Sequence, residues 1–178
     1  MDLECRTVVL QVRSRPSATR DNPAMANPDD PAALAAAFAD ARYRVPELGD
    51  AGTVHVGTEP SALEAILPAE HYAFITAWNA DSETGDKPDN DRADGELAAE
   101  LDRLGVRRFR AHAADAQGGH HEDGWVVLDL PVVHLDRLAR DFGQDGVLSW
   151  HAGEPVRLRL YHREPADAAS MLWVDWTG

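Results

Sequence analysis

The feature that most constrains the fold of this chain is a nearly continuous apolar run from His71 to Trp78, which reads His-Tyr-Ala-Phe-Ile-Thr-Ala-Trp. The run is rich in aromatic and β-branched residues, which favour a strand. It lacks the alternation of polar and apolar residues that a strand with one solvated face shows. The run therefore predicts a central strand of a sheet whose two faces are both covered.

The segment after this strand predicts a helix and a hairpin. A helix is expected to open at Asn90 and to end at Gly105, with its apolar positions at helical spacing. Those positions are Ala93, Leu97, Leu101 and Leu104. Residues 107–113 alternate between polar and apolar side chains, and a glycine-rich turn joins them to residues 125–130. The two segments are predicted to pair as a hairpin.

A second helix and a second hairpin follow. The helix is marked by an apolar face and by Gly143 at its end. The members of that face are Val133, Leu135, Leu138, Ala139 and Phe142. Residues 147–150 and 156–161 then flank a Gly-Glu-Pro turn, which is typical of paired strands. Residues 171–176 are too apolar to remain solvated and predict an edge strand or a docked tail.

The segment before the central strand predicts a helix, a strand and a second helix. Residues 31–43 are rich in alanine and carry apolar residues at helical spacing. Residues 54–57 read as a short strand. Residues 58–67 read as a helix that Thr58 or Ser61 can cap.

The order strand, helix, strand, strand, helix, strand predicts an α+β fold with a ferredoxin-like sandwich core (β-α-β-β-α-β). An extra hairpin strand and an N-terminal helix-strand-helix extension add to this core. With 178 residues, one domain is expected. We assign residues 1–30 to an N-terminal tail, 31–161 to a single α+β domain, and 162–178 to a C-terminal tail or edge strand.

The charge of the chain argues against several classes of partner. The formal net charge is −14, from 31 acidic and 17 basic residues. Such a chain repels phosphate backbones and anionic lipids, so neither nucleic acid nor a membrane is expected as a partner. The paired arginines on predicted strands, Arg108 with Arg110 and Arg157 with Arg159, are expected to bind the protein's own carboxylates.

The expected location is the cytoplasm. No apolar run approaches the length of a membrane span, and residues 1–20 lack the pattern of a signal peptide. Cys5 is the single cysteine, so no disulfide can form within the chain. Cys5 lies in the predicted tail and is not expected to act as a nucleophile. An exposed apolar C-terminal segment would make a homodimer possible.

Four segments together resemble the bacterial family catalogued as domain of unknown function 3293. They are Arg42-Tyr43-Arg44-Val45, Ala73 to Asn79, Phe142-Gly143-Gln144 and Val147-Leu148-Ser149-Trp150. The resemblance runs from about Ala33 to Tyr161. Ala80 stands where the family usually has proline, and Glu122-Asp123-Gly124 stands in place of Glu-Pro-Ser. The resemblance implies a compact bacterial domain and a location for a site, but no reaction.

A candidate ligand site follows from polar residues at the ends of apolar elements, where sites tend to form. The residues are Thr76, Asn79, Ser82, Asn90 and Gln144. Neutral hydrogen-bonding groups of this kind suit a planar amide, a base or a peptide backbone. The same residues can instead form turns and helix caps. We predict a non-catalytic regulatory module that binds a small molecule or a protein, without a cofactor.

The position of Gln144 gives this hypothesis a structural criterion. Gly143 is expected to adopt the left-handed conformation that ends a helix and to turn Gln144 toward the sheet. A member of the site should be substantially buried there and hydrogen-bonded to Thr76, Asn79 or their backbone. A surface turn residue would instead be exposed.

Two other functions stay open. Glu122 could act as an acid or base in a small enzyme, with Asn79, Asn90 and Gln144 orienting the substrate. The strong negative charge would also suit an acidic interaction or inhibitor protein.

Two further groups of residues carry weaker signals. One hairpin is crowded with potential metal ligands: His112, Asp115, His120, His121, Glu122 and Asp123. Their spacing fits no known ligand motif, so a solvated turn is favoured and no metal is predicted. Ser149 and His151 would share one face of a strand, but no nucleophile elbow surrounds them.

We predict that Met25 is the first residue of the native protein, because Met25-Ala26-Asn27-Pro28 leads directly into the cap of the first helix. Mass spectrometry of the N-terminal peptide of the native protein checks this expectation. A peptide from native lysate that spans Arg20 to Met25 would contradict it.

Overall fold

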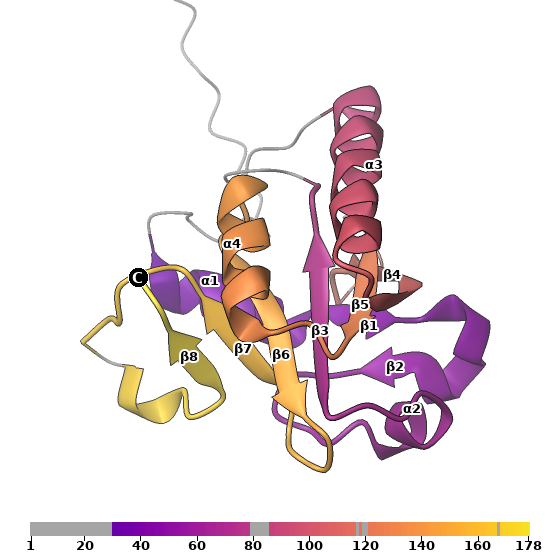
Figure 1. Ribbon diagram of the computed structural model, residues 1–178. Helices are drawn as coiled ribbons and strands as arrows, with labels where there is room; N and C mark the ends of the chain where they lie inside the picture. Colours follow the sequence, from indigo (N-terminus) through magenta and orange to yellow (C-terminus); the bar gives the residue numbers. More distant parts are fainter. Residues whose placement is uncertain (1–29, 79–85, 117, 119–120, 167) are drawn as a thin grey trace, which may run out of the picture.

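The computed structural model describes residues 30–78, 86–116, 118, 121–166 and 168–178 (Figure 1). The helices are α1 (Pro31–Asp40), η1 (Pro46–Gly52), α2 (Ser61–Ile66), α3 (Lys87–Arg103), α4 (Val132–Asp141) and η3 (Ala168–Ser170). The strands are β1 (Arg42–Arg44), β2 (Thr53–Val54), β3 (His71–Thr76), β4 (Arg107–Ala114), β5 (Glu122–Leu128), β6 (Gly146–His151), β7 (Arg157–Leu160) and β8 (Val174–Trp176).

The described strands form one mixed sheet of eight, in the order β2-β1-β4-β5-β3-β6-β7-β8. The predicted central strand is β3, which pairs antiparallel with β5 on one side and β6 on the other. All six of its residues are buried. The apolar run therefore forms the strand that its composition predicts, covered on both faces.

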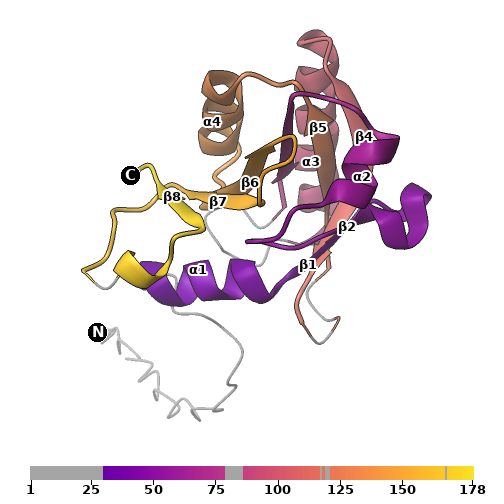
Figure 2. The same cartoon turned by 90° about the horizontal axis from the view of Figure 1, so that it is seen from below.

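Two hydrophobic cores lie on the two faces of the sheet. On one face, Leu34 of α1 and Leu63 of α2 pack against Phe74 of β3. On the other face, helices α3 and α4 bury Leu97 and Leu135 against the sheet. Figure 2 shows α1 and α4 on opposite sides of the sheet. Successive residues of β3 alternate between the two cores, which is the geometry of any strand and explains why the whole run must be apolar.

Both predicted hairpins are confirmed. Strands β4 and β5 pair antiparallel from Arg107 opposite Leu128 to Ala113 opposite Glu122. Strands β6 and β7 pair antiparallel as well. The last strand, β8, pairs with β7 in parallel, so the apolar C-terminal segment forms an edge strand.

The N-terminal part differs from the prediction at the first helix and at the strand predicted over residues 54–57, which is instead the two-residue strand β2 at Thr53–Val54. The first helix was expected to reach Tyr43, but α1 ends at Asp40, and residues 42–44 form β1 between β2 and β4. Tyr43 is buried between two exposed arginines, and its hydroxyl donates to the Phe38 carbonyl. A buried tyrosine in an alternating triplet fits a strand better than a last helical turn.

The predicted caps of two helices are also wrong. Helix α2 begins after Pro60 and has no side-chain cap, because the Thr58 hydroxyl donates instead to the His55 carbonyl. Helix α3 begins at Lys87, and Asp86 caps it by accepting from the Asp89 amide. Asn90 therefore lies inside the first turn. Proline at the second helical position favours this earlier start.

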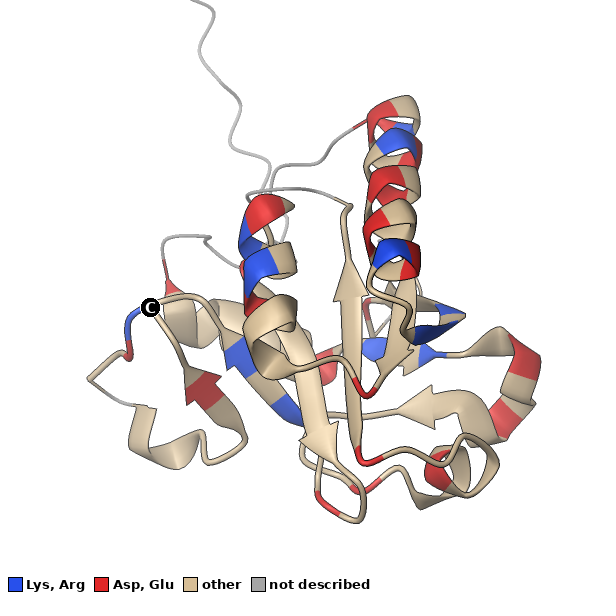
Figure 3. Ribbon diagram, viewed as in Figure 1, with Lys and Arg blue, Asp and Glu red and all other residues tan. Residues whose placement is uncertain are grey.

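The paired arginines on β4 and β7 bind the protein's own carboxylates, as predicted. Each of the four pairs with a different aspartate: Arg108 with Asp102, Arg110 with Asp94, Arg157 with Asp175 and Arg159 with Asp136. Figure 3 shows acidic and basic residues interspersed along α3. No helix among the described residues is long and apolar enough to cross a membrane.

We predict opposite effects of adding one methyl group at two glycines. A Cβ at Gly124 in β5 would lie 2.7 Å from the Ile75 carbonyl oxygen, so Gly124→Ala should destabilise the protein by about 1–3 kcal/mol. Gly95 is exposed in α3 with open space around it, so Gly95→Ala should stabilise by about 0.5–1 kcal/mol. Urea unfolding of the two variants checks the signs, and equal effects would contradict the close approach at Gly124.

Candidate functional site

The predicted site residues that the structure describes lie at one end of the sheet, where β3 ends, α3 begins and α4 ends (Figure 1). Thr76 is buried at the last position of β3. Its hydroxyl donates to the Asp123 carbonyl at 2.7 Å and accepts from the Trp78 amide at 3.0 Å. The Thr76 side chain therefore ties the end of β3 to the start of β5.

Gln144 lies beside the same strand end. Gly143 has a φ of 61°, the predicted left-handed conformation, and ends α4. The Gln144 side-chain amide donates to the Trp78 carbonyl at 3.0 Å and to the Phe142 carbonyl at 3.2 Å. Gln144 is partly buried. The turn places Gln144 next to Trp78, whereas Thr76 and Asn79 were the predicted neighbours.

The other predicted residues are less closely joined. Asn90 is buried in the first turn of α3 and has an interaction partner. Glu122 is partly buried at the start of β5 and also has a partner. Asn79 and Ser82 lie outside the described residues. Thr76 and Gln144 use their hydrogen bonds to hold the fold, so ligand binding by the predicted group stays a prediction.

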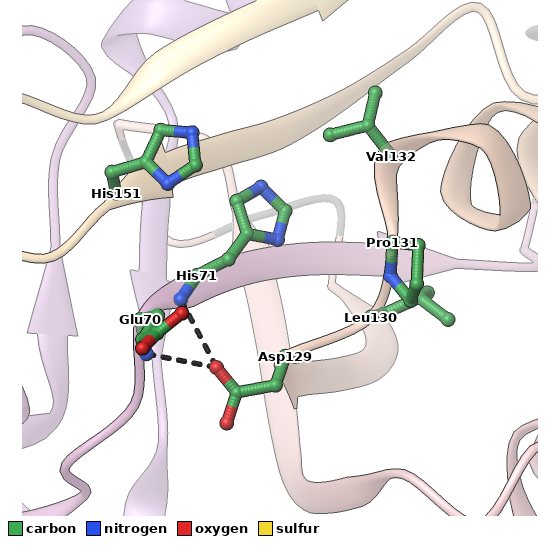
Figure 4. Close-up of a pocket in the computed structure, with 7 residues that line it drawn as sticks. All are labelled: Glu70, His71, Asp129, Leu130, Pro131, Val132 and His151. Carbon is green, nitrogen blue, oxygen red and sulfur yellow. Dashed lines mark hydrogen bonds between the residues drawn. The ribbon is translucent and has the colours of Figure 1, made fainter.

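A pocket that the sequence reading missed lies at the opposite end of β3 (Figure 4). Its volume is about 230 Å³. It forms where β3 begins, β5 ends, α4 begins and β6 ends. The residues that line it are Glu70, His71, Asp129, Leu130, Pro131, Val132 and His151.

Asp129 fixes the backbone at this end. It is the one described residue other than glycine with a positive φ, at 58°. One carboxylate oxygen accepts from the Glu70 amide at 2.8 Å and from the His71 amide at 3.2 Å. The other lies 3.5 Å from Arg107. Although partial burial opposes charge, these hydrogen bonds keep the pKa of Asp129 below its usual value.

His71 forms the buried wall of the pocket, and 8% of its surface is exposed. Its Nε2 lies 2.8 Å from the Ser149 hydroxyl. Its Nδ1 is buried and makes no well-formed hydrogen bond among the described residues, although the Leu130 backbone interacts favourably with the protonated ring. The His151 ring lies 5.1 Å away, between ring centres. Burial, with the neighbouring His151, lowers the pKa of His71 below 6.5, so the ring is neutral at pH 7.

The start of α4 forms the wall opposite His71. No side chain caps this ten-residue helix, whose first amide-to-carbonyl bonds run from His134 and Leu135 to Pro131. The amides of Val132 and Val133 have no acceptor among the described residues. Such amides give a helix start a partial positive charge and a capacity to bind acceptors.

The histidine and acidic residues crowded in the β4–β5 hairpin contact one another as side-chain neighbours. The rings of His112 and His121 lie 4.7 Å apart, and His121 lies 3.1 Å from Asp123. Across the described part of the chain, no three histidine, cysteine or acidic residues are arranged to hold a metal ion. His120 lies outside that part.

Comparison with known protein families identifies the segment that runs from the end of β3 to the start of β6. Residues 75–147 match the family described as "Protein of unknown function (DUF3293)". This segment belongs to DUF3293. The match confirms the resemblance read from the sequence and places Thr76, Asn90, Glu122 and Gln144 within the DUF3293 segment. No curated protein and no solved structure matched the chain.

The DUF3293 segment also contains Asp129 and the start of α4, whereas His71 and His151 flank it. The sequence reading paired Ser149 with His151, but the hydroxyl meets His71 on the neighbouring strand instead. The signal available was His71 itself, a polar residue at the first position of a run that is mostly apolar. The hydrogen-bond partner of His71 depends on the pairing of β3 with β6, which the sequence alone does not predict.

We expect Gln144→Ala to lower the free energy of unfolding by about 1–3 kcal/mol, because the Trp78 carbonyl would lose a partly buried hydrogen bond. Gln144→Glu should cost at least as much, since a carboxylate would face two carbonyl oxygens. Urea unfolding measures both. A change below about 0.5 kcal/mol in Gln144→Ala would mean that Gln144 is an ordinary surface residue.

Stability should fall as the pH drops below about 6.5. The pKa of His71 is lower in the folded protein than in the unfolded chain, so the unfolded state takes up the proton first. The stabilisation is complete above the unfolded pKa of 6.5 and is lost as the pH falls toward the folded pKa. His112 contributes in the same sense.

Urea unfolding between pH 8 and pH 5 measures this slope. In the His71→Gln variant the slope should be smaller, because one of the two histidines no longer titrates. An unchanged slope in that variant would contradict the assignment to His71.

Proposed function

We propose that the protein is a non-catalytic module that binds a small molecule in the pocket beside His71. The observation that carries this proposal is the pocket itself, about 230 Å³ in volume, in which His71 and His151 stand beside an apolar wall of Leu130, Pro131 and Val132. Small-molecule sites are typically concave and largely apolar, with a few polar groups that orient the ligand.

The position of Ser149 favours binding over nucleophilic catalysis. The pair of Ser149 and His71 has the distance of a nucleophile and its base. However, Ser149 is buried and does not line the pocket, so a substrate there would not meet its hydroxyl. Its hydrogen bond instead orients the His71 ring. An enzyme based on Glu122 and an acidic inhibitor stay as alternative predictions.

A ferredoxin-like core is part of the same proposal. The strand order β4-β5-β3-β6 with antiparallel neighbours is the order of a split β-α-β-β-α-β unit. The packing of α3 and α4 against one face supports it as well. Folds of this kind serve many functions, so the argument for binding rests on the pocket alone.

Other expectations from the sequence extend the proposal. They are a bacterial origin, a cytoplasmic location, a regulatory role, and a second ligand contact at Thr76, Asn79, Ser82, Asn90 and Gln144. The hydrogen bond from Gln144 to Trp78 supports the last of these, because it keeps two predicted elements in contact.

We expect a tryptophan at position 132 to fill the pocket and to abolish binding. Val132 lines the pocket, whereas the next residue, Val133, is 71% exposed. Val133→Trp is therefore a matched control that should bind normally. Thermal-shift screening against a broad set of metabolites, including acids, amides, amines and nucleosides, identifies ligands of the unaltered protein. Binding that survives Val132→Trp, or the absence of any ligand in the screen, would overturn the proposed function.

A further inference from the structure

We infer that the ligand of the His71 pocket is a small primary amine with an apolar body, bound as its ammonium ion beside Glu70 and Asp129. This inference rests on the proposed function and names its ligand class. It follows from the charges that line the pocket, from the side-chain hydrogen-bonding groups left free there, and from the size and apolar wall of the pocket.

The charges at the pocket leave it negative. Glu70 and Asp129 line it, whereas none of the described lysines and arginines does. Arg107 lies outside the lining and offsets one of these charges, with its guanidinium 3.5 Å from Asp129. The start of α4 contributes about half a positive elementary charge. His71 adds none at pH 7, because burial lowers its pKa. The remaining charge is negative and favours a cation over an anion.

The side-chain groups left free at the pocket are hydrogen-bond acceptors. The Glu70 carboxylate has no hydrogen-bond or ion-pair partner among the described residues, although the Glu70 backbone amide donates to Asp129. One oxygen of Asp129 is held by two backbone amides, and the second has only the longer contact with Arg107. The exposed imidazole of His151 makes no hydrogen bond within the described chain.

These acceptors suit an ammonium group. A carboxylate only accepts hydrogen bonds, and a neutral imidazole has one acceptor nitrogen. An ammonium group is a compact positive charge that donates three hydrogen bonds and accepts none. It therefore matches the pocket in both charge and hydrogen bonding, whereas a carboxylate ligand would face two carboxylates of the protein.

The size and lining of the pocket set the rest of the ligand. Figure 4 shows Glu70 and Asp129 next to each other, with Pro131 and Val132 on the other side of the view. Leu130, Pro131 and Val132 form the apolar wall. The volume of about 230 Å³ is below the range of about 300–1,000 Å³ that drug-sized ligands occupy. An amine with one ring or a short branched chain fits these limits.

The test compares benzylamine with benzyl alcohol, which has nearly the same shape without the charge, and with benzoate. Titration at pH 8, followed by NMR of the His151 ring and of the Leu130 and Val132 amides, reports the site directly. An alkylammonium group stays charged at this pH, as lysine does. Benzylamine should shift these signals. Benzyl alcohol should bind about tenfold more weakly, because it lacks the attraction to two carboxylates, and benzoate should bind more weakly still.

A pair of variants that remove the same charge tests the role of Glu70. Glu70→Gln keeps the side-chain size and the backbone amide that donates to Asp129. Glu96→Gln is the matched control, because Glu96 is exposed on α3 and does not line the pocket. Glu70→Gln should weaken benzylamine binding about fivefold, the factor that one charge pair in contact contributes in water. Glu96→Gln should leave it unchanged, and neither variant should alter the binding of benzyl alcohol.

The outcomes separate this inference from the proposed function. Equal affinity for benzylamine and benzyl alcohol, or equal affinity of Glu70→Gln and Glu96→Gln for benzylamine, would overturn the ammonium site. A metabolite screen that yields only neutral or anionic ligands, blocked by Val132→Trp, would overturn it too, while the proposed function would stand. If neither benzylamine nor any member of the screen binds, both fail.

Discussion

The burial of β3 on both faces is the constraint on which the rest of the structure depends. Its four central residues belong alternately to two hydrophobic cores, and helices cover both faces of the sheet around it. A strand of this kind tolerates polar side chains only where each finds a partner. Its polar residues stand at its two ends, where His71 meets Ser149 and Thr76 meets the Asp123 carbonyl. The polar side chains of β3 are thereby confined to the two ends of the strand.

Helix α4 runs from one end of β3 to the other. Because β5 and β6 both run antiparallel to β3, the helix that joins them starts near the beginning of β3 and ends near its end. Its first residues form a wall of the pocket, and the turn after it places Gln144 on Trp78. The same ten residues bury Leu135 and Leu138 against the sheet. The position of the pocket wall and the position of Gln144 therefore depend on one packed helix.

Much of the fold could be predicted because hydrophobic periodicity depends on local sequence. The central strand, both hairpins and the two helices over one face follow from such patterns, and the turn at Gly143 follows from its glycine. The errors concern short elements. The strand at residues 42–44 is too brief to show a period, and its pairing with β4 is a contact between segments distant in the sequence. Tertiary contacts of this kind override local propensity.

The candidate site could be predicted only in part, for a related reason. Gln144 and Thr76 were found because they stand at the ends of strong apolar patterns. The pocket was missed because it joins residues 70–71, 129–132 and 151, and strand register alone brings these together. The left-handed backbone of Asp129 also leaves no mark in the sequence, since aspartate is common in many other conformations.

The left-handed backbone of Asp129 limits which amino acids can replace it during evolution. Glycine and asparagine accept a φ of 58° easily, but glycine lacks the carboxylate that holds the amides of Glu70 and His71. Asparagine keeps one acceptor oxygen and loses the charge beside Arg107. β-Branched residues are excluded by the backbone itself. Few amino acids can therefore replace Asp129, although 47% of its side chain is exposed.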